Sequence, residues 1–148
     1  MRRILLAASA AAMLAMPLTA QAAGSSSSTP SVSIGEVKRF VDRGEWQKAI
    51  VRAYQYLDDN PRSADAYNYI GYSHRQKGEY AKAQEAYDEA LNIDPNHVGA
   101  HEYYGELHIK LGDMASAEKH LGMLTKICGN CAEQQELTAA IAKAKTGG

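Results

Sequence analysis

Cysteine is almost absent from this sequence. Only Cys128 and Cys131 occur among the 148 residues, and no cysteine precedes Cys128. A small disulfide scaffold would be rich in cysteine, so the chain does not belong to that class. It also has no cysteine near its N-terminus that a lipid could modify.

A marked excess of charge of either sign is missing as well. The sequence has 16 basic and 17 acidic residues, which gives a net charge of −1. Nucleic-acid binding requires a basic face, so this balance argues against it. The phosphate-binding glycine loop, the G-x-S-x-G motif and the H-E-x-x-H motif are all absent. We therefore expect a protein that is not an enzyme and that has no cofactor and no metal.

Long apolar runs are confined to the first 22 residues. Two arginines precede the apolar run Ile4–Ala15, and Ala20-Gln21-Ala22 has the small-x-small pattern of a signal-peptidase site. A membrane-spanning helix needs about 20 apolar residues, whereas Pro17 interrupts this run. We predict a signal peptide over residues 1–22 and no membrane insertion after its cleavage. The mature protein would be periplasmic or secreted.

The next segment has the composition of a linker. Residues 23–33 contain four consecutive serines together with glycine and proline. Such a composition is typical of a flexible, solvated chain. The remaining residues, 34–148, are long enough to form one domain.

The organising pattern of the chain lies in residues 64–95. A first helix is indicated by four residues at i, i+3, i+4 and i+7: Tyr67, Ile70, Gly71 and His74. A second helix is indicated by four residues with similar spacing after Gly78: Ala83, Tyr87, Ala90 and Leu91. Asp94–Pro95 ends this helix, because the residue before proline is disfavoured in the α region.

The same pattern recurs 34 residues away in both directions along the chain. Towards the C-terminus, three positions of this unit correspond to Gly105, Gly112 and Ala117. Towards the N-terminus, three positions correspond to Gly44, Ala49 and Pro61. The first half of the N-terminal unit is degenerate, as expected of a terminal repeat.

This order and spacing resembles the tetratricopeptide repeat, a helix–turn–helix unit whose length is about 34 residues. The resemblance implies an all-α fold, an α-solenoid of three repeats followed by a C-terminal capping helix. The repeats would cover residues 30–63, 64–97 and 98–130, and the capping helix residues 131–145. We predict seven helices: Ile34–Arg43, Trp46–Asp58, Ala64–Lys77, Tyr80–Ile93, Val98–Leu111, Met114–Ile127 and Cys131–Lys145.

The resemblance also implies a function and a site. In this family the first helix of each repeat lines the inner face of the superhelix, which commonly holds a peptide. We therefore expect a protein–protein interaction module that binds a protein or peptide on its concave face. The candidate residues are polar or aromatic positions of the first helices that the packing pattern does not use: Lys38, Asp42, Asn68, Tyr69, Tyr72, Arg75, Gln76, Glu102, Tyr103, Glu106 and Lys110.

The charges at these positions indicate the charge expected of the partner. One version of this groove binds a C-terminal carboxylate through basic residues, but here Ile34 and Gly99 occupy two of those places. Glu102 and Glu106 add negative charge instead. We therefore expect a partner of mixed or slightly basic charge.

The remaining feature is the Cys128-Gly129-Asn130-Cys131 segment. In an exported protein two such cysteines form a disulfide, and we predict that Asn130 caps the next helix. The C-x-x-C motif also resembles that of thioredoxin-like oxidoreductases, so a periplasmic thiol–disulfide protein is an alternative, and a metal site is a third. A self-associating assembly subunit, and hence a homo-oligomer, is a further alternative for the whole chain.

The five histidines form no recognised metal-binding spacing with the cysteines. His74 and His108 occupy equivalent positions in their repeats, and His101 stands where Tyr67 stands in the preceding one. We expect these three side chains to pack inside the stack.

Overall fold

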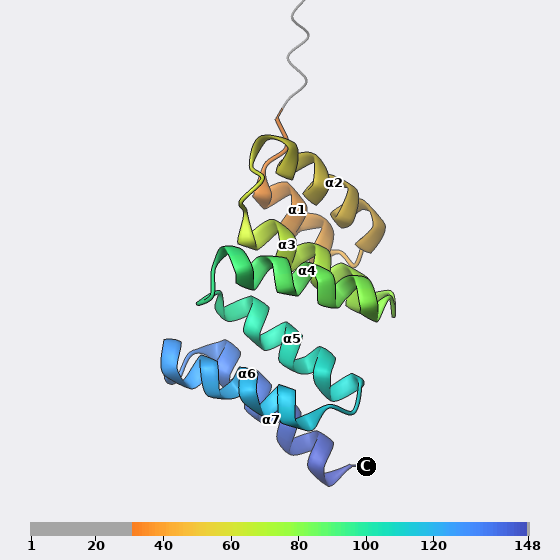
Figure 1. The fold of residues 1–148 in the computed structure, drawn as a ribbon. Helices are drawn as coiled ribbons and strands as arrows, with labels where there is room; N and C mark the ends of the chain where they lie inside the picture. The colour runs from red at the N-terminus through yellow and green to blue at the C-terminus, as the bar shows by residue number, and fades with distance from the viewer. Residues whose placement is uncertain (1–30, 148) are drawn as a thin grey trace, which may run out of the picture.

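The computed structural model describes residues 31–147, which form seven helices and no strand (Figure 1). The predicted signal peptide, residues 1–22, and most of the predicted linker lie outside the described residues. The helices are α1 (Ile34–Asp42), α2 (Trp46–Asp59), α3 (Ala64–Gln76), α4 (Tyr80–Ile93), α5 (Val98–Lys110), α6 (Met114–Ile127) and α7 (Ala132–Thr146). Each predicted helix is present, with bounds within one residue, and the predicted all-α solenoid is confirmed.

The first helix of each pair begins at a side chain that caps it. The Oγ of Ser33 accepts a hydrogen bond from the amide of Glu36, and the Oγ of Ser63 accepts one from Ala66. His97 takes this role in α5, where its Nδ1 accepts from the amide of Ala100 at 3.0 Å. Such bonds satisfy backbone donors that a helix N-terminus leaves free. Ser33, predicted to be the last linker residue, therefore belongs to the folded domain.

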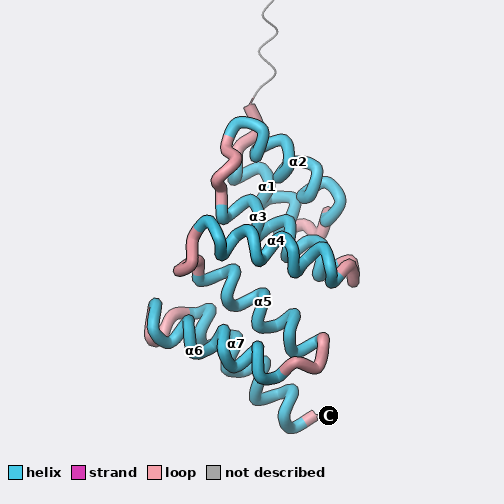
Figure 2. The backbone as a smooth tube through the Cα atoms, viewed as in Figure 1, coloured by secondary structure: helices cyan, strands magenta, loops and turns pink. Residues whose placement is uncertain are grey.

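The turn inside each pair needs a residue with positive φ. Gly44, Gly78 and Gly112 occupy these turns with φ of 70°, 76° and 79°. Glycine adopts this region without steric cost, which explains why it recurs at the same place in each pair. The loops that join the helices are accordingly short (Figure 2).

The helices form two layers that curve. The odd-numbered helices contact one another in the order α1, α3, α5, α7. Within residues 31–147, α2 does not contact α4 and α4 does not contact α6. The odd-numbered layer is therefore the tighter, concave one. In Figure 1 the even-numbered helices lie towards the viewer, so their layer is the convex face.

Small residues allow neighbouring helices to approach closely. Gly71 of α3 lies against the ring of Tyr87, so close that a Cβ at this position would lie 2.6 Å from the ring. Gly105 of α5 lies equally close to Leu137 of α7. Tyr87 and Leu137 are both fully buried. These contacts fix the spacing of neighbouring helices, because protein interiors are close-packed.

Among the described residues, none of the helices has the length and apolar character needed to cross a membrane.

Candidate functional site

An open groove crosses the concave face over α1, α3 and α5. Its volume is about 610 Å³. Seven of the eleven predicted binding residues line it: Lys38, Asp42, Asn68, Tyr69, Tyr72, Glu102 and Tyr103. The fold thus brings side chains from three repeats to one surface, as expected if the first helix of each repeat faces inwards.

The other four predicted residues do not line the groove. Arg75 is only 6% exposed, and its Nη1 lies 2.6 Å from Oε2 of Glu106. Its guanidinium also lies over the rings of Tyr72 and Tyr103, at 5.1 and 5.6 Å from their centroids. Arg75 and Glu106 therefore link α3 to α5 beneath the tyrosine rings, with the arginine buried and the glutamate partly exposed. Gln76 and Lys110 lie near the ends of their helices, outside the groove.

Other groove residues were not predicted. Trp46 packs edge-on against Tyr72, with ring centroids 5.8 Å apart, and Glu133 of α7 closes one end of the groove. His97 also lines the groove. The location of His97 could have been predicted from the repeat, because this residue corresponds to the helix-capping Ser63 one repeat earlier. Glu133 has no such signal, since α7 lies outside the repeat pattern.

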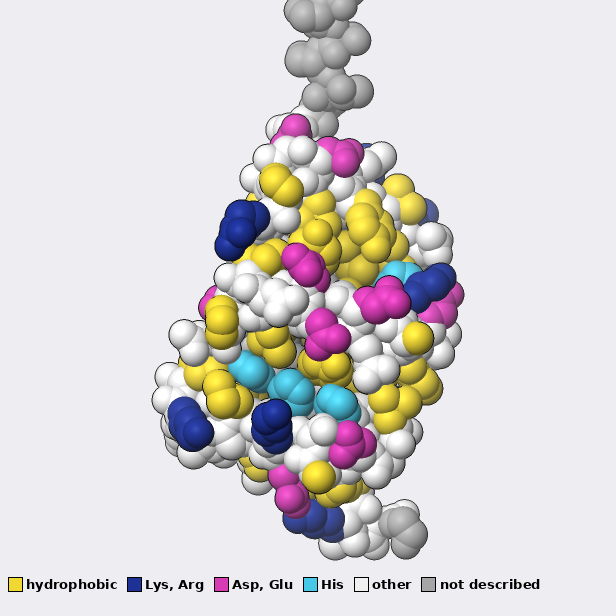
Figure 3. All heavy atoms as spheres, in the orientation of Figure 1, with side chains coloured by type: hydrophobic (Ala, Val, Ile, Leu, Met, Phe, Trp, Pro, Cys, Tyr) yellow, Lys and Arg dark blue, Asp and Glu magenta, His cyan; other side chains and the backbone are white. Residues whose placement is uncertain are grey.

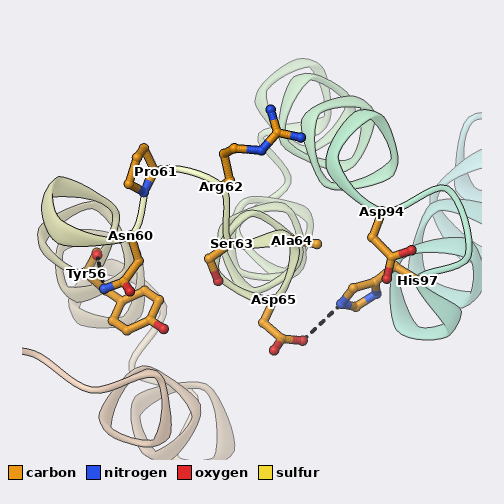
Figure 4. A pocket seen from close by; sticks show the side chains of 9 residues that line it. All are labelled: Tyr56, Asn60, Pro61, Arg62, Ser63, Ala64, Asp65, Asp94 and His97. Carbon is orange, nitrogen blue, oxygen red and sulfur yellow. Dashed lines mark hydrogen bonds and ion pairs between the residues drawn. The ribbon is translucent and has the colours of Figure 1, made fainter.

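A second hollow continues the groove over its rim, with a volume of about 600 Å³. It lies where the α2–α3 and α4–α5 loops meet, and it shares Asp65, Asp94 and His97 with the groove. Figure 4 shows Asp65 and His97 pointing towards each other beside the start of α3, with Nε2 of His97 3.0 Å from Oδ1 of Asp65. The groove and this hollow are therefore continuous.

Glu102 is the most buried acidic residue of the groove, at 3% exposure. Burial raises the pKa of its carboxyl to about 9, and the neighbouring carboxylates of Glu136, Glu106 and Glu133 add to this effect. Both causes disfavour the charged form. Glu102 is therefore protonated near neutral pH.

A different cluster lies towards the convex face, where histidine side chains gather over α5 and α6 (Figure 3). His101 and His120 approach each other through their Nδ1 atoms at 2.9 Å, and Nε2 of His101 lies 3.0 Å from the carbonyl oxygen of Pro95. Because that carbonyl can only accept, Nε2 of His101 carries the proton and its Nδ1 accepts from His120. His108 stacks on Tyr104 beside this pair, with ring centroids 4.6 Å apart.

This cluster predicts a loss of stability in acid. Burial lowers the pKa of His120 from 6.5 to about 4, and His101, His108 and Lys119 contribute to the shift. A group with a lowered folded-state pKa stabilises the fold above its unfolded pKa and loses this contribution as pH falls. We expect the urea midpoint of the wild type, measured relative to that of His120→Phe, to fall as pH decreases from about 6.5 towards 4. If the urea midpoints of the wild type and His120→Phe changed equally with pH, this assignment would be contradicted.

Within residues 31–147, no three histidine, cysteine or acidic side chains are arranged to hold a metal ion.

The two cysteines connect α6 to α7. Cys128 is the C-cap of α6, Cys131 is the N-cap of α7, and their sulfur atoms lie 2.04 Å apart. The predicted cap by Asn130 is wrong, because α7 begins one residue later and has no side-chain cap. The Oδ1 of Asn130 instead accepts a hydrogen bond from Nε2 of Gln135. Cys128 and Cys131 thus lie between α6 and α7.

Comparisons with known proteins agree with this architecture. Two family models described as tetratricopeptide repeat match residues 34–98 and 74–141. No curated protein matches the sequence.

Solved structures with the same fold have low sequence identity. A tetratricopeptide repeat protein from Parabacteroides merdae is 18% identical, with a TM-score of 0.63 over 76% of this chain, which spans only 44% of that protein. The TPR2B domain of yeast Sti1, solved as a pHsp70 complex, is 20% identical, with a TM-score of 0.68 over 75% of this chain and 91% of that one. The Yersinia enterocolitica type III secretion translocator chaperone SycD is 17% identical, with a TM-score of 0.65 over 75% and 84% of the two chains.

The two sequence matches together span all three helix pairs and most of α7, and the observed fold agrees with them. The chain therefore belongs to the tetratricopeptide repeat family.

Proposed function

We propose that this chain binds an extended segment of a partner protein in the groove over α1, α3 and α5. One observation carries the proposal: residues from three successive repeats, among them Lys38, Tyr69 and Glu102, line a single open groove. The tyrosines suit such a surface, since a rigid ring gives contact area while its hydroxyl keeps a hydrogen bond. The yeast domain, solved as a complex with pHsp70, supports protein binding by this fold.

We also propose that the protein works outside the cytoplasm, in the periplasm or beyond it. The support is the sequence of residues 1–22, which has the basic start, apolar run and cleavage pattern of a signal peptide. This proposal is independent of the groove.

The groove assignment is tested by recovering partners from a cell extract with matched baits. Tyr69→Ala removes a half-buried ring from the groove, whereas Tyr54→Ala removes a ring that is 53% exposed on α2, outside the groove. We expect Tyr69→Ala to weaken partner binding at least tenfold, because loss of an aromatic anchor costs about 2 kcal/mol. Tyr54→Ala should bind as the wild type does.

Circular dichroism of both baits controls for folding. Equal recovery of the same partners with both variants would contradict the groove assignment.

A further inference from the structure

The groove carries more acidic than basic side chains. Five lining residues are acidic: Asp42, Asp65, Asp94, Glu102 and Glu133. Its two basic residues, Lys38 and His97, are already paired. Nζ of Lys38 lies 2.8 Å from the carboxylate of Asp42, and Nε2 of His97 lies 3.0 Å from that of Asp65. These contacts occupy both basic side chains and leave an acidic remainder.

That remainder is concentrated at the α5 end of the groove. Asp94, Glu102 and Glu133 form no ion pair with any residue in the part of the chain that the structure describes. The charged groups around Glu102 are also acidic: Glu133 and Glu136 on α7, and Glu106 on α5 itself. Arg75 of α3, which is buried, is already bound to Glu106. Glu102 therefore has no cationic partner within residues 31–147.

A second, independent feature lies beside it. Asn68 of α3 is 5% exposed, lines the groove, and has an Oδ1 with no hydrogen-bond partner among the described residues. Its amide lies against Gly99 of α5, where a Cβ would lie only 3.1 Å from Nδ2. A buried acceptor without a donor is costly, so such groups are normally satisfied. Within the described residues, this end of the groove thus contains an unused acceptor and a carboxyl group that has no cationic partner and bonds only to another carboxyl group, that of Glu136.

We propose that the α5 end of the groove, between Asn68 and Glu102, binds a cationic group of the partner segment: a lysine or arginine side chain, or a free α-amino group. The inference rests on the proposed function and specifies the chemistry of its ligand. The cation donates hydrogen bonds to Asn68 and to the carboxylate of Glu102. The carboxyl proton of Glu102 leaves to solvent as the cation enters, so the filled site holds one positive and one negative charge.

The protonated state of Glu102 makes this exchange measurable. Its carboxyl group holds a proton near neutral pH, because burial and the adjacent carboxylates raise its pKa. A cation favours the ionised form, so each cation bound releases one proton. The affinity for a cationic segment should then increase up to tenfold per pH unit between about pH 6 and 8.

The test uses three short peptides with blocked ends and one sequence, in which serine alternates with lysine, glutamine or glutamate. Each is titrated into the whole chain at about 0.15 M salt, which screens contacts between exposed charges. NMR shifts of Asn68, Gly99 and Glu102 locate the binding. Calorimetry in buffers of different ionisation enthalpy measures the protons released. Two variants are compared with the wild type: Glu102→Gln, and Glu89→Gln at an exposed position of α4.

We expect the lysine peptide to bind at the α5 end at least tenfold more tightly than the other two, with release of about one proton. Glu102→Gln should weaken this binding and remove its pH dependence, whereas Glu89→Gln should change neither. Groove binding that is equal for the lysine and glutamine peptides, or that releases no proton, would overturn the inference and leave the proposed function standing. If none of the peptides shifts groove resonances, both are overturned.

Discussion

Arg75→Ala is expected to lower the free energy of unfolding by about 3 kcal/mol, the lower end of the cost of breaking a buried ion pair. The side chain of Arg75 is 5% exposed, and its guanidinium contacts Glu106 of the next repeat as well as Tyr72 and Tyr103. Truncation removes this packing and leaves the carboxylate of Glu106 without its partner. Urea unfolding followed by circular dichroism measures the loss.

Two further variants separate charge from packing at this position. Arg75→Met keeps most of the volume and should recover part of the lost stability, because apolar residues can replace a buried ion pair at little cost. Gln76→Ala, at the exposed neighbour on the same helix, should stay within about 0.5 kcal/mol of the wild type. If Arg75→Ala were no more destabilising than Gln76→Ala, the link between α3 and α5 would have no energetic importance.

Gly71→Ala is expected to destabilise the protein by about 3 kcal/mol, the upper part of the usual cost of overpacking. The added Cβ would lie 2.6 Å from Cε1 and 2.7 Å from Cδ1 of Tyr87. The ring of Tyr87 is fully buried and stacks on Tyr104, so it has no space into which to move. Thermal or urea unfolding measures the change.

Gly122→Ala is the matched control. Gly122 also lies inside a helix, α6, but a Cβ there has no neighbouring atom within 4 Å. Alanine is favoured over glycine in a helix interior by about 0.5–1 kcal/mol, so this variant should be more stable than the wild type. Opposite signs for the two substitutions are the expected result. A stabilised Gly71→Ala protein would show that the α3–α4 contact is looser than described.

The helices were predictable because their signals are local and recur. Each turn glycine, such as Gly78, has a counterpart at the same place in the neighbouring repeat, and one recognised unit therefore located the others. The groove residues followed from the resemblance to the family, which implies that the first helix of each repeat lines the inner face. A residue such as Tyr69 was found in this way.

The repeat pattern does not distinguish residues that face the groove from residues that pack behind it. Arg75 follows Tyr72 by three positions and so shares its side of the helix, but its long side chain turns under the tyrosine rings to reach Glu106. Glu133 belongs to a helix outside the repeat. The contact between His101 and His120 joins two helices through a pair of ring nitrogens, which no spacing rule predicts.

The buried apolar residues form three separate clusters rather than one continuous core. One contains Val37 and Ile70, the next Tyr87 and Leu107, and the last Leu124 and Leu137. Such an arrangement allows the ends of the stack to open without global unfolding, as in other proteins built of repeats. The groove, however, includes residues from all three repeats. It exists only while all of them are folded, so a segment bound as proposed would slow amide hydrogen exchange along the whole stack and couple its otherwise local opening events.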